Sequence, residues 1–355
     1  MAAGGGGDAV GALLARRALG DTDERRPLVT TCAWERLRID PVPGPRARTD
    51  FTGLGLVDGE PQEVLPTSDT IPSGRSVLPR LAETGDARIF LHDFVGGALG
   101  LSDQLQKLAE ALDVIRLVVV DVGGDIVARG HESNLKSPLA DSLTLAAALR
   151  TKIPTAVVVL GPGADAELTE GEVLGLLEEV GATTVGKITG DDVRSLQAVL
   201  PWHPTEASAL VAAGAEGLRG SVAMRRGHAP VRITDYTPKV WLAREPLLES
   251  FPLARALQGT TNLPEAEDVM RAAAVNEMDF ERKVAEDPRR YQPPSNLPRL
   301  MADMEDAGAT HITNRRLSEA LGQQRFVAAS ATLRHKLGGL WSLDDLEQLA
   351  DLTER

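Results

Sequence analysis

The sequence has one cysteine, Cys32, among its 355 residues. A lone thiol cannot form an intrachain disulfide, which suits a reducing compartment such as the cytoplasm. No apolar run approaches the roughly 20 residues of a membrane-spanning helix. The start of the chain also lacks the basic and apolar regions of a signal peptide. We therefore expect a cytoplasmic protein that is neither exported nor embedded in a membrane.

Basic residues are outnumbered: 38 Lys and Arg stand against 51 Asp and Glu, and the formal charge is -13. This balance argues against broad attraction to nucleic acid or to anionic lipid. Lysine contributes only 7 of the basic residues, so arginine is abundant and a single arginine says little about anion recognition. The partner we expect is a small, anionic substrate, with neither nucleic acid nor membrane involved. Assembly into a homo-oligomer stays open.

Apolar runs rich in Val and Ile recur in the first half of the chain, with helical patterns between them. This alternation is typical of a parallel sheet with crossover helices. The predicted strands are Leu28 to Ala33, Arg88 to Leu91, Val114 to Val122, Thr155 to Leu160 and Thr183 to Ile188. We expect residues 1–200 to form a three-layer, Rossmann-like α/β ligand-binding core with a mainly parallel sheet.

The pattern changes after residue 200, where we expect a mixed α+β extension, residues 201–355, packed on the core. Gly220 to Met224 and Val231 to Thr234 predict a hairpin with a longer loop, which Lys239 to Ala243 extends. Helices follow. The proline-rich stretch from Asp287 to Pro298 predicts a linker.

A glycine-rich loop opens the chain, followed at once by apolar residues at helical spacing. Glycine amides can approach an anion closely, and the N-terminus of a helix attracts negative charge. The ligand-binding residues predicted here are Gly4, Gly5, Gly6, Gly7 and Asp8. A glycine-rich terminal tail is the alternative, and neither the Walker ending nor the dinucleotide pattern is present. Because a strand normally precedes such a loop, we expect one that is very short or lost upstream of an incorrectly chosen start.

Acids and glycines also follow the predicted strands, at the edge where open α/β sheets bind ligands. They are His92 and Asp93 with Gly96 and Gly97 after the second strand, and Asp121 with Gly123, Gly124 and Asp125 at the end of the third. We expect these segments to converge with the glycine loop, so that the loop, Asp93 and Asp125 line one cavity.

The roles predicted for these residues follow from their chemistry. Carboxylates can divide into general acid and base or hold Mg²⁺ against a phosphate. We expect Asp125, Asp93 and His92 to be catalytic. If the enzyme uses Mg²⁺, Asp121 and Asp125 are the expected ligands. The residues expected to lie beside the cofactor are the four glycines Gly96, Gly97, Gly123 and Gly124. The alternative is that Asp93 and Asp121 cap helices and brace loops, with His92 as a structural histidine.

Weaker signals lie on the same predicted edge. Glu35 stands where nucleotide-binding folds often place an acid that binds a ribose hydroxyl, although a salt bridge with a nearby arginine is an alternative. The loop Gly161 to Asp165 adds glycines and an acid, and Lys136 with Ser137 at a helix start can meet an anion. Cys32, inside an apolar strand, is predicted to be a buried, inert thiol.

Several of these segments together resemble the prokaryotic domain of unknown function 1152 family. The resemblance rests on Ala2 to Ala12, Trp34 to Arg36, Asp40 to Arg46, His92 to Gly97, Asp121 to Asp125 and Ser137 to Asp141. It covers roughly residues 2–335, departs chiefly in the missing strand before the glycines, and implies no particular reaction. Gly123-Gly124-Asp125 alone is similar to D-glutamate cyclase-type lyases, which place an acid beside paired glycines after a core strand.

These observations favour a metabolic enzyme, a transferase or a lyase, that binds a nucleotide or phosphorylated small molecule through the glycine loop. Carboxylates at strand ends would assist group transfer or elimination. One alternative is a cofactor-free lyase or cyclase acting on a small carboxylic acid. Another is a non-catalytic binding protein, in which the acids would be scattered or engaged by local caps.

Overall fold

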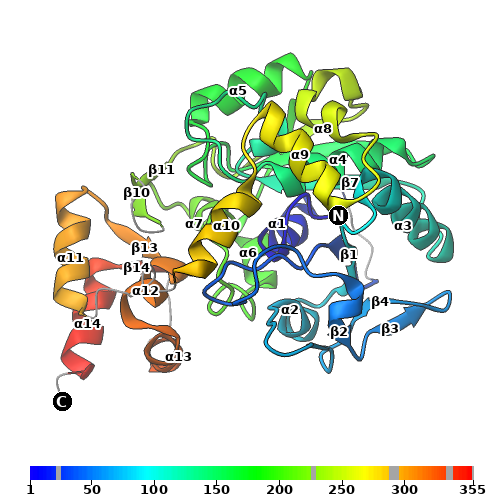
Figure 1. Ribbon diagram of the computed structural model, residues 1–355. Helices are drawn as coiled ribbons and strands as arrows, with labels where there is room; N and C mark the ends of the chain where they lie inside the picture. The colour runs from blue at the N-terminus through cyan, green and yellow to red at the C-terminus, as the bar shows by residue number, and fades with distance from the viewer. Residues whose placement is uncertain (21–24, 225–228, 288–295, 333–338, 354–355) are drawn as a thin grey trace.

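The computed structural model describes residues 1–20, 25–224, 229–287, 296–332 and 339–353 (Figure 1). The architecture is mixed α/β, with several sheets that contain both parallel and antiparallel pairs. Within the described ranges, no helix is both long enough and apolar enough to cross a membrane.

The strands of the main sheets are short and mostly buried. They are β1 (Leu28–Thr31), β3 (Gly55–Val57), β4 (Glu60–Val64), β6 (Arg88–Leu91), β7 (Leu117–Val122), β8 (Thr155–Leu160), β9 (Thr183–Lys187) and β12 (Lys239–Ala243). The smaller sheets are built from β2 (Phe51–Thr52), β5 (Asp69–Thr70), β10 (Gly220–Ala223), β11 (Val231–Ile233), β13 (His311–Thr313) and β14 (Leu340–Ser342).

Helices connect these strands and follow them. The α-helices are α1 (Gly6–Ala15), α2 (Leu78–Thr84), α3 (Gly97–Ala111), α4 (Leu139–Arg150), α5 (Glu170–Glu179), α6 (Gly190–Ser195), α7 (Ala207–Ala215), α8 (Pro252–Leu257), α9 (Leu263–Ala273), α10 (Glu277–Glu286), α11 (Leu297–Asp306), α12 (Asn314–Leu321), α13 (Gln323–Thr332) and α14 (Leu343–Thr353). Short 3₁₀ turns are η1 (Arg48–Asp50), η2 (Asp125–Val127) and η3 (Leu248–Ser250).

Residues Met1–Ala3 fill the gap between two four-stranded sheets, one ordered β1-β6-β4-β3 and the other β7-β8-β12-β9. The N–H of Ala2 donates to the carbonyl of Thr30 at 2.8 Å, and the N–H of Ala3 donates to the carbonyl of Val120 at 2.8 Å. Ala2 also forms a parallel bridge with Val120. The very short strand expected before the glycine loop is therefore present, and it joins the two sheets.

The central pairs are parallel, as predicted: β1 with β6, and β7 with β8. The predicted hairpin forms between β10 and β11, with its turn at 225–228 outside the described residues. The position predicted for Lys239 to Ala243 is wrong. Instead of extending the hairpin, β12 lies antiparallel between β8 and β9. Its Val240 and Leu242 side chains are buried in the same core as Val158 of β8, which favours this place.

Alternate residues of β7 and β8 point into two different hydrophobic clusters. Val119 and Val157 pack with helices that include α3, α4, α8 and α9. Val120 and Val158 pack with the opposite set, which includes α1, α2 and α7. α1 lies so close to the sheet that a Cβ added at Gly11 would be 2.2 Å from Val122. This contact places the middle of α1 beside the end of β7.

A third cluster belongs to the C-terminal elements α11–α14, grouped at one end of the molecule in orange and red (Figure 1). Ile312 and the fully buried Trp341 are at its centre. β13 pairs with β14 and, in parallel, with β10, which connects this unit to the rest of the chain. Most of the predicted linker, residues 288–295, lies outside the described residues, and the division at residue 200 stays a prediction.

Candidate functional site

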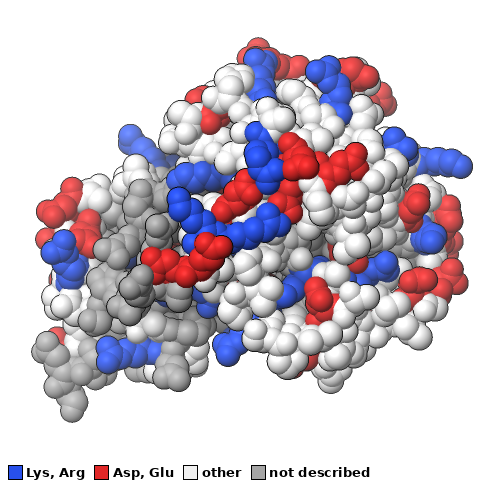
Figure 2. Space-filling model, viewed as in Figure 1, with Lys and Arg blue, Asp and Glu red and all other residues white. Residues whose placement is uncertain are grey.

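A cavity of about 390 Å³ opens at the carboxyl ends of Met1–Ala3, β1, β7 and β8. The glycine loop Gly4–Gly7 forms part of its wall, and the segments that follow β1, β7 and β8 contribute Glu35, Asp125 and Asp165. Figure 2 shows basic and acidic side chains mingled on the face of the molecule that is seen in Figure 1. The predicted convergence of the glycine loop and Asp125 on one cavity is confirmed.

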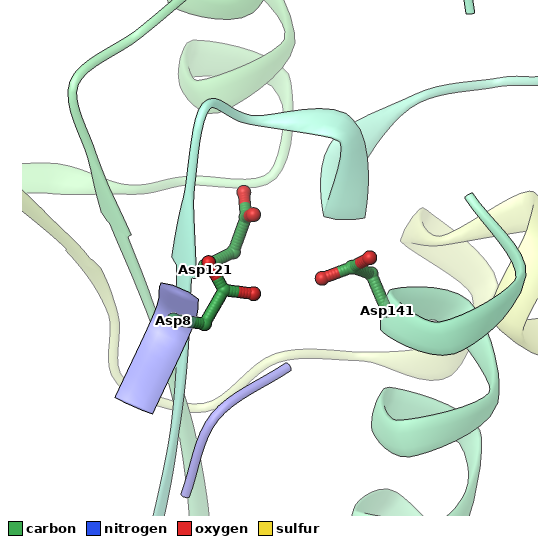
Figure 3. A group of neighbouring side chains, drawn as sticks. All are labelled: Asp8, Asp121 and Asp141. Carbon is green, nitrogen blue, oxygen red and sulfur yellow. The ribbon is translucent and has the colours of Figure 1, made fainter. Parts of the chain in front are cut away.

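Three carboxylates from three different elements face one another in this cavity. Asp8 comes from the first turn of α1, Asp121 from β7 and Asp141 from the first turn of α4 (Figure 3). One oxygen atom from each lies within 4.8 Å of the others. We call these residues the acid triad. Such spacing suits a single cation with oxygen ligands.

Hydrogen bonds fix the position of Asp8. Its Oδ2 accepts from the N–H of Gly4 at 2.7 Å, and its Oδ1 accepts from the N–H of Val122 at 3.2 Å. Gly4 also lies against Asp141, because a Cβ added there would be 3.3 Å from its Oδ1. The glycine at position 4 therefore leaves room for the triad to assemble.

The acids of the triad are largely removed from solvent, and the charge of Arg36, which also lines the cavity, offsets only part of this cost at Asp8. Only 1% of Asp121 and 6% of Asp141 is exposed, and Oδ2 of Asp121 and Oδ1 of Asp141 have no hydrogen-bond partner among the described residues. Burial raises the pKa of Asp8 to about 6. Burial, and then the charge of Asp8, raise the pKa of Asp121 and that of Asp141 well above the usual range. Buried carboxylates in this state hold protons or a cation.

Asp125 lies beside the triad on η2 and lines the same cavity. It is 6% exposed; burial first, and then the charge of Asp141, raise its pKa well above the usual range. A side-chain hydrogen bond joins it to Asp121. A protonated Asp125 can therefore donate a hydrogen bond to an ionised Asp121. Such a pair offers one proton donor and one proton acceptor, the roles of general acid and general base.

The cavity wall at the start of α1 also carries hydrogen-bond donors. Gly5 is the N-cap of α1, and the first amides of a helix have no partner within it. His203 lies next to them: a Cβ added at Gly6 would be 3.5 Å from its Nε2. Its Nδ1 accepts from the N–H of Thr205 at 3.2 Å, whereas Nε2 has no partner among the described residues. Burial lowers the pKa of His203 to about 3, so the ring is neutral.

Glu35 lines the cavity and also supports the segment before α2. Its Oε1 accepts from the hydroxyl of Ser76 at 3.1 Å and from the N–H of Val77 at 2.8 Å. Burial raises its pKa to about 7. Binding of a sugar hydroxyl by Glu35 stays a prediction.

Asp93 and His92 do not line the cavity, so the prediction that Asp93 converges with the glycine loop is wrong. β6 lies beyond β1, one strand farther from the triad. The carboxylate of Asp93 accepts hydrogen bonds from the backbone N–H and from Nε of Arg48, both at 3.2 Å. These bonds brace η1, which contains Arg48. His92 is 2% exposed, with Nδ1 2.9 Å from the hydroxyl of Thr30.

The paired glycines predicted to contact a cofactor also lie outside the cavity lining. Gly97 has a φ of +59° and lies against the backbone of Thr260, where an added Cβ would be 2.6 Å from the carbonyl oxygen; its neighbour Gly96 is similarly close to Gly100. Gly123 and Gly124 have φ of +138° and +114°, and their Cα atoms lie against the side chains of Asp165 and Val173. Turn geometry and close packing account for all four glycines.

Lys136 and Ser137 meet an anion, as the sequence suggested, but the anion is the carboxylate of Glu167 in this chain and not a ligand. Glu167 accepts from the N–H of Lys136 at 2.8 Å and from the N–H of Ser137 at 2.9 Å. Ser137 and Glu167 both line the cavity. Cys32 is buried, as predicted.

Several lining residues were not predicted from the sequence. Asp141 is one of the few polar positions in an otherwise apolar α4, and this contrast could have identified it. His203 follows α6 in an irregular segment that gave no signal. Arg315 and Phe326 come from α12 and α13, far along the chain. Nη1 of Arg315 donates a hydrogen bond to Oε2 of Glu206 at 3.1 Å. This ion pair holds the C-terminal unit against the cavity wall.

Comparison with known proteins places the chain in a family but gives no activity. Neither the curated proteins nor the solved structures include a significant match. A family model matches residues 1–285, which is shorter than the range to residue 335 expected from the motifs. The matched part contains the glycine loop, the acid triad and His203, whereas α11–α14 lie outside it. The chain belongs to the family described as protein of unknown function (DUF1152).

Proposed function

We propose that this protein is an enzyme that binds a divalent cation at the acid triad and a nucleotide or phosphorylated small molecule at the glycine loop. The reaction would be a group transfer or an elimination. One observation carries the proposal: carboxylates from α1, β7 and α4 meet within 4.8 Å, and two of them have an oxygen with no partner among the described residues. A non-catalytic scaffold has no need for this costly arrangement.

The triad fits Mg²⁺ or Mn²⁺. Both are hard cations that prefer carboxylate oxygens as ligands. Three such oxygens would come from the triad, one each from Asp8, Asp121 and Asp141. Bound there, the cation would neutralise charge on phosphate oxygens. Asp125, outside the triad but joined to Asp121, is the residue we assign to proton transfer. In this assignment Asp121 remains a metal ligand, and Asp125 acts next to it.

The order of the parallel segments supports the same proposal. From Met1–Ala3 the chain passes to β1 and β6 on one side, then crosses to β7 and β8 on the other. Ligands in open α/β sheets bind where the strand order reverses in this way. The cavity lies at this crossing, so we extend the proposal to a Rossmann-like, three-layer core whose ligand site is built on Met1–Ala3 and β7.

Isothermal titration of the full chain with Mn²⁺ tests the cation site. We expect one tight site in the wild type and an affinity loss of about tenfold or more in Asp141→Asn, because a ligand oxygen becomes an amide. Asp93→Asn is the matched control: it removes another acid that follows a strand, but one outside the cavity. Equal Mn²⁺ affinity in all three proteins would contradict the proposal.

A thermal-shift screen tests the substrate class. Nucleotides, sugar phosphates and small carboxylic acids are compared with and without Mg²⁺. We expect a phosphorylated compound to raise the melting temperature, and to do so more strongly with Mg²⁺. Stabilisation by carboxylic acids alone, independent of Mg²⁺, would instead favour a cofactor-free lyase or cyclase.

A further inference from the structure

We infer that a phosphoryl-binding subsite lies on the cavity wall formed by the start of α1 and the segment after α6, where a neutral His203 donates a hydrogen bond from Nε2 beside the amides that begin α1. The inference rests on the proposed function and assigns one group of the substrate to named residues. His203 acts here as a binding and positioning residue.

The hydrogen bond to Nδ1 determines which nitrogen of the ring carries the proton. The N–H of Thr205 donates to Nδ1 of His203 at 3.2 Å, so Nδ1 carries a lone pair in place of a proton. A neutral imidazole with an accepting Nδ1 has its proton on Nε2. Burial keeps the ring neutral, with a pKa of about 3. Nε2–H is therefore a fixed donor and not a proton carrier at neutral pH.

This donor has no acceptor among the described residues, although His203 is only 2% exposed. A buried donor without a partner loses its hydrogen bond to water and gains nothing in return, which destabilises the folded state. The ring is held in place, because Trp202 packs against it with 5.2 Å between the ring centroids. An acceptor supplied by a ligand in the cavity would remove this cost.

The position of Nε2 indicates what that acceptor is. Nε2 is 3.5 Å from where a Cβ on Gly6 would lie, at the first residue of the ten-residue α1. Gly5, Gly6 and Gly7 at the start of α1 line the same cavity, and the first amides of a helix have no partner within it and lie at its positive end. Two kinds of donor, from α1 and from the segment after α6, therefore face one part of the cavity.

A cation completes this wall. The Arg80 guanidinium lies 4.2 Å above the ring of Trp202, the residue before His203, and Arg80 also lines the cavity. Among the described residues, it forms no ion pair with a carboxylate. Helix amides, an imidazole N–H and a guanidinium together suit the several oxygens and high charge of a phosphoryl group better than the two oxygens of a carboxylate.

Titration of the full chain with inorganic phosphate, in EDTA and again with Mg²⁺, tests the subsite. His203→Asn keeps an acceptor for the Thr205 N–H but loses the distal donor, whereas His203→Gln places an N–H near the position of Nε2. We expect His203→Asn to weaken phosphate binding about tenfold or more, as for loss of one hydrogen bond to a charged group. His203→Gln should stay within about threefold of the wild type, given that its donor is retained.

Three results would overturn the inference: unchanged phosphate affinity in His203→Asn, equal losses in both variants, or no phosphate binding by the wild type in either buffer. Tighter binding of malonate than of phosphate would overturn the phosphoryl assignment. Mn²⁺ titration separates this inference from the proposed function. If Mn²⁺ binds at the triad but His203→Asn binds phosphate normally, only the subsite fails. If His203→Asn loses phosphate affinity and Mn²⁺ does not bind, only the cation site fails.

Discussion

The N–H of Gly4 donates to Oδ2 of Asp8 at 2.7 Å, so the Asp8 side chain turns back over the loop that precedes its own helix. In this position it faces Asp141, which comes from a helix more than a hundred residues later in the chain. The glycine loop thus does two things: it exposes amides at the start of α1 and brings an acid into the triad.

Gly4→Ala should disrupt the triad while leaving the fold intact. Its Cβ would lie 2.9 Å from Oδ2 of Asp8 and 3.3 Å from Oδ1 of Asp141, so at least one carboxylate must move. We expect Mn²⁺ affinity, measured by calorimetry, to fall about tenfold or more. Gly171→Ala on α5, where an added Cβ meets nothing within 4 Å, is the control. Wild-type Mn²⁺ affinity in Gly4→Ala would contradict the prediction.

Asp125→Asn should abolish turnover of the phosphorylated ligand identified by the screen, at little cost in stability. The change is isosteric, and because burial already favours the neutral carboxyl, a neutral amide suits the site. Urea unfolding and turnover are measured on the same preparation. Retained turnover would remove Asp125 from the chemistry, and an unfolded variant would assign it to the scaffold.

Much of the central fold could be predicted from hydrophobic periodicity. β6 and β8 have the predicted bounds, and β1 and β7 lie within the predicted ranges, because buried apolar strands give a strong local signal. The position of β12 could not be predicted. Its sequence identifies a strand, but its partners β8 and β9 lie roughly 80 and 55 residues earlier in the chain, and strand propensity does not specify long-range pairing.

The site was predictable only where residues directly follow a central strand. Gly4–Gly7, Asp121 and Asp125 meet because the segments before them are neighbours in the sheet. Asp93 follows a strand by the same pattern, yet it is one strand too far away and is engaged by Arg48. His203 belongs to no regular element, so only the tertiary structure shows that it reaches the start of α1.

A divalent cation should stabilise the protein more at high pH than at low pH. Asp8 has a folded pKa of about 6 against an ordinary value of 3.8, so it binds its proton more tightly when folded. Its contribution to stability is fully present below pH 3.8 and is lost as the pH rises through 6. Above that pH the ionised triad binds the cation without competition from protons. Thermal unfolding with Mn²⁺ or EDTA should therefore differ more at pH 8 than at pH 5. An equal effect at both pH values would count against the triad as the cation site.

Glu35→Gln should stabilise the protein at pH 8 and leave its stability unchanged near pH 4.5. The folded pKa of Glu35 is about 7 against an ordinary 4.5, so the favourable contribution of its protonated form is complete below pH 4.5 and is lost as the pH rises through 7. The glutamine keeps an oxygen for the N–H of Val77 and never ionises. We expect the free energy of unfolding in urea to be higher in the variant by on the order of 2 kcal/mol at pH 8. The same difference at both pH values would show that packing, and not the charge of Glu35, separates the two proteins.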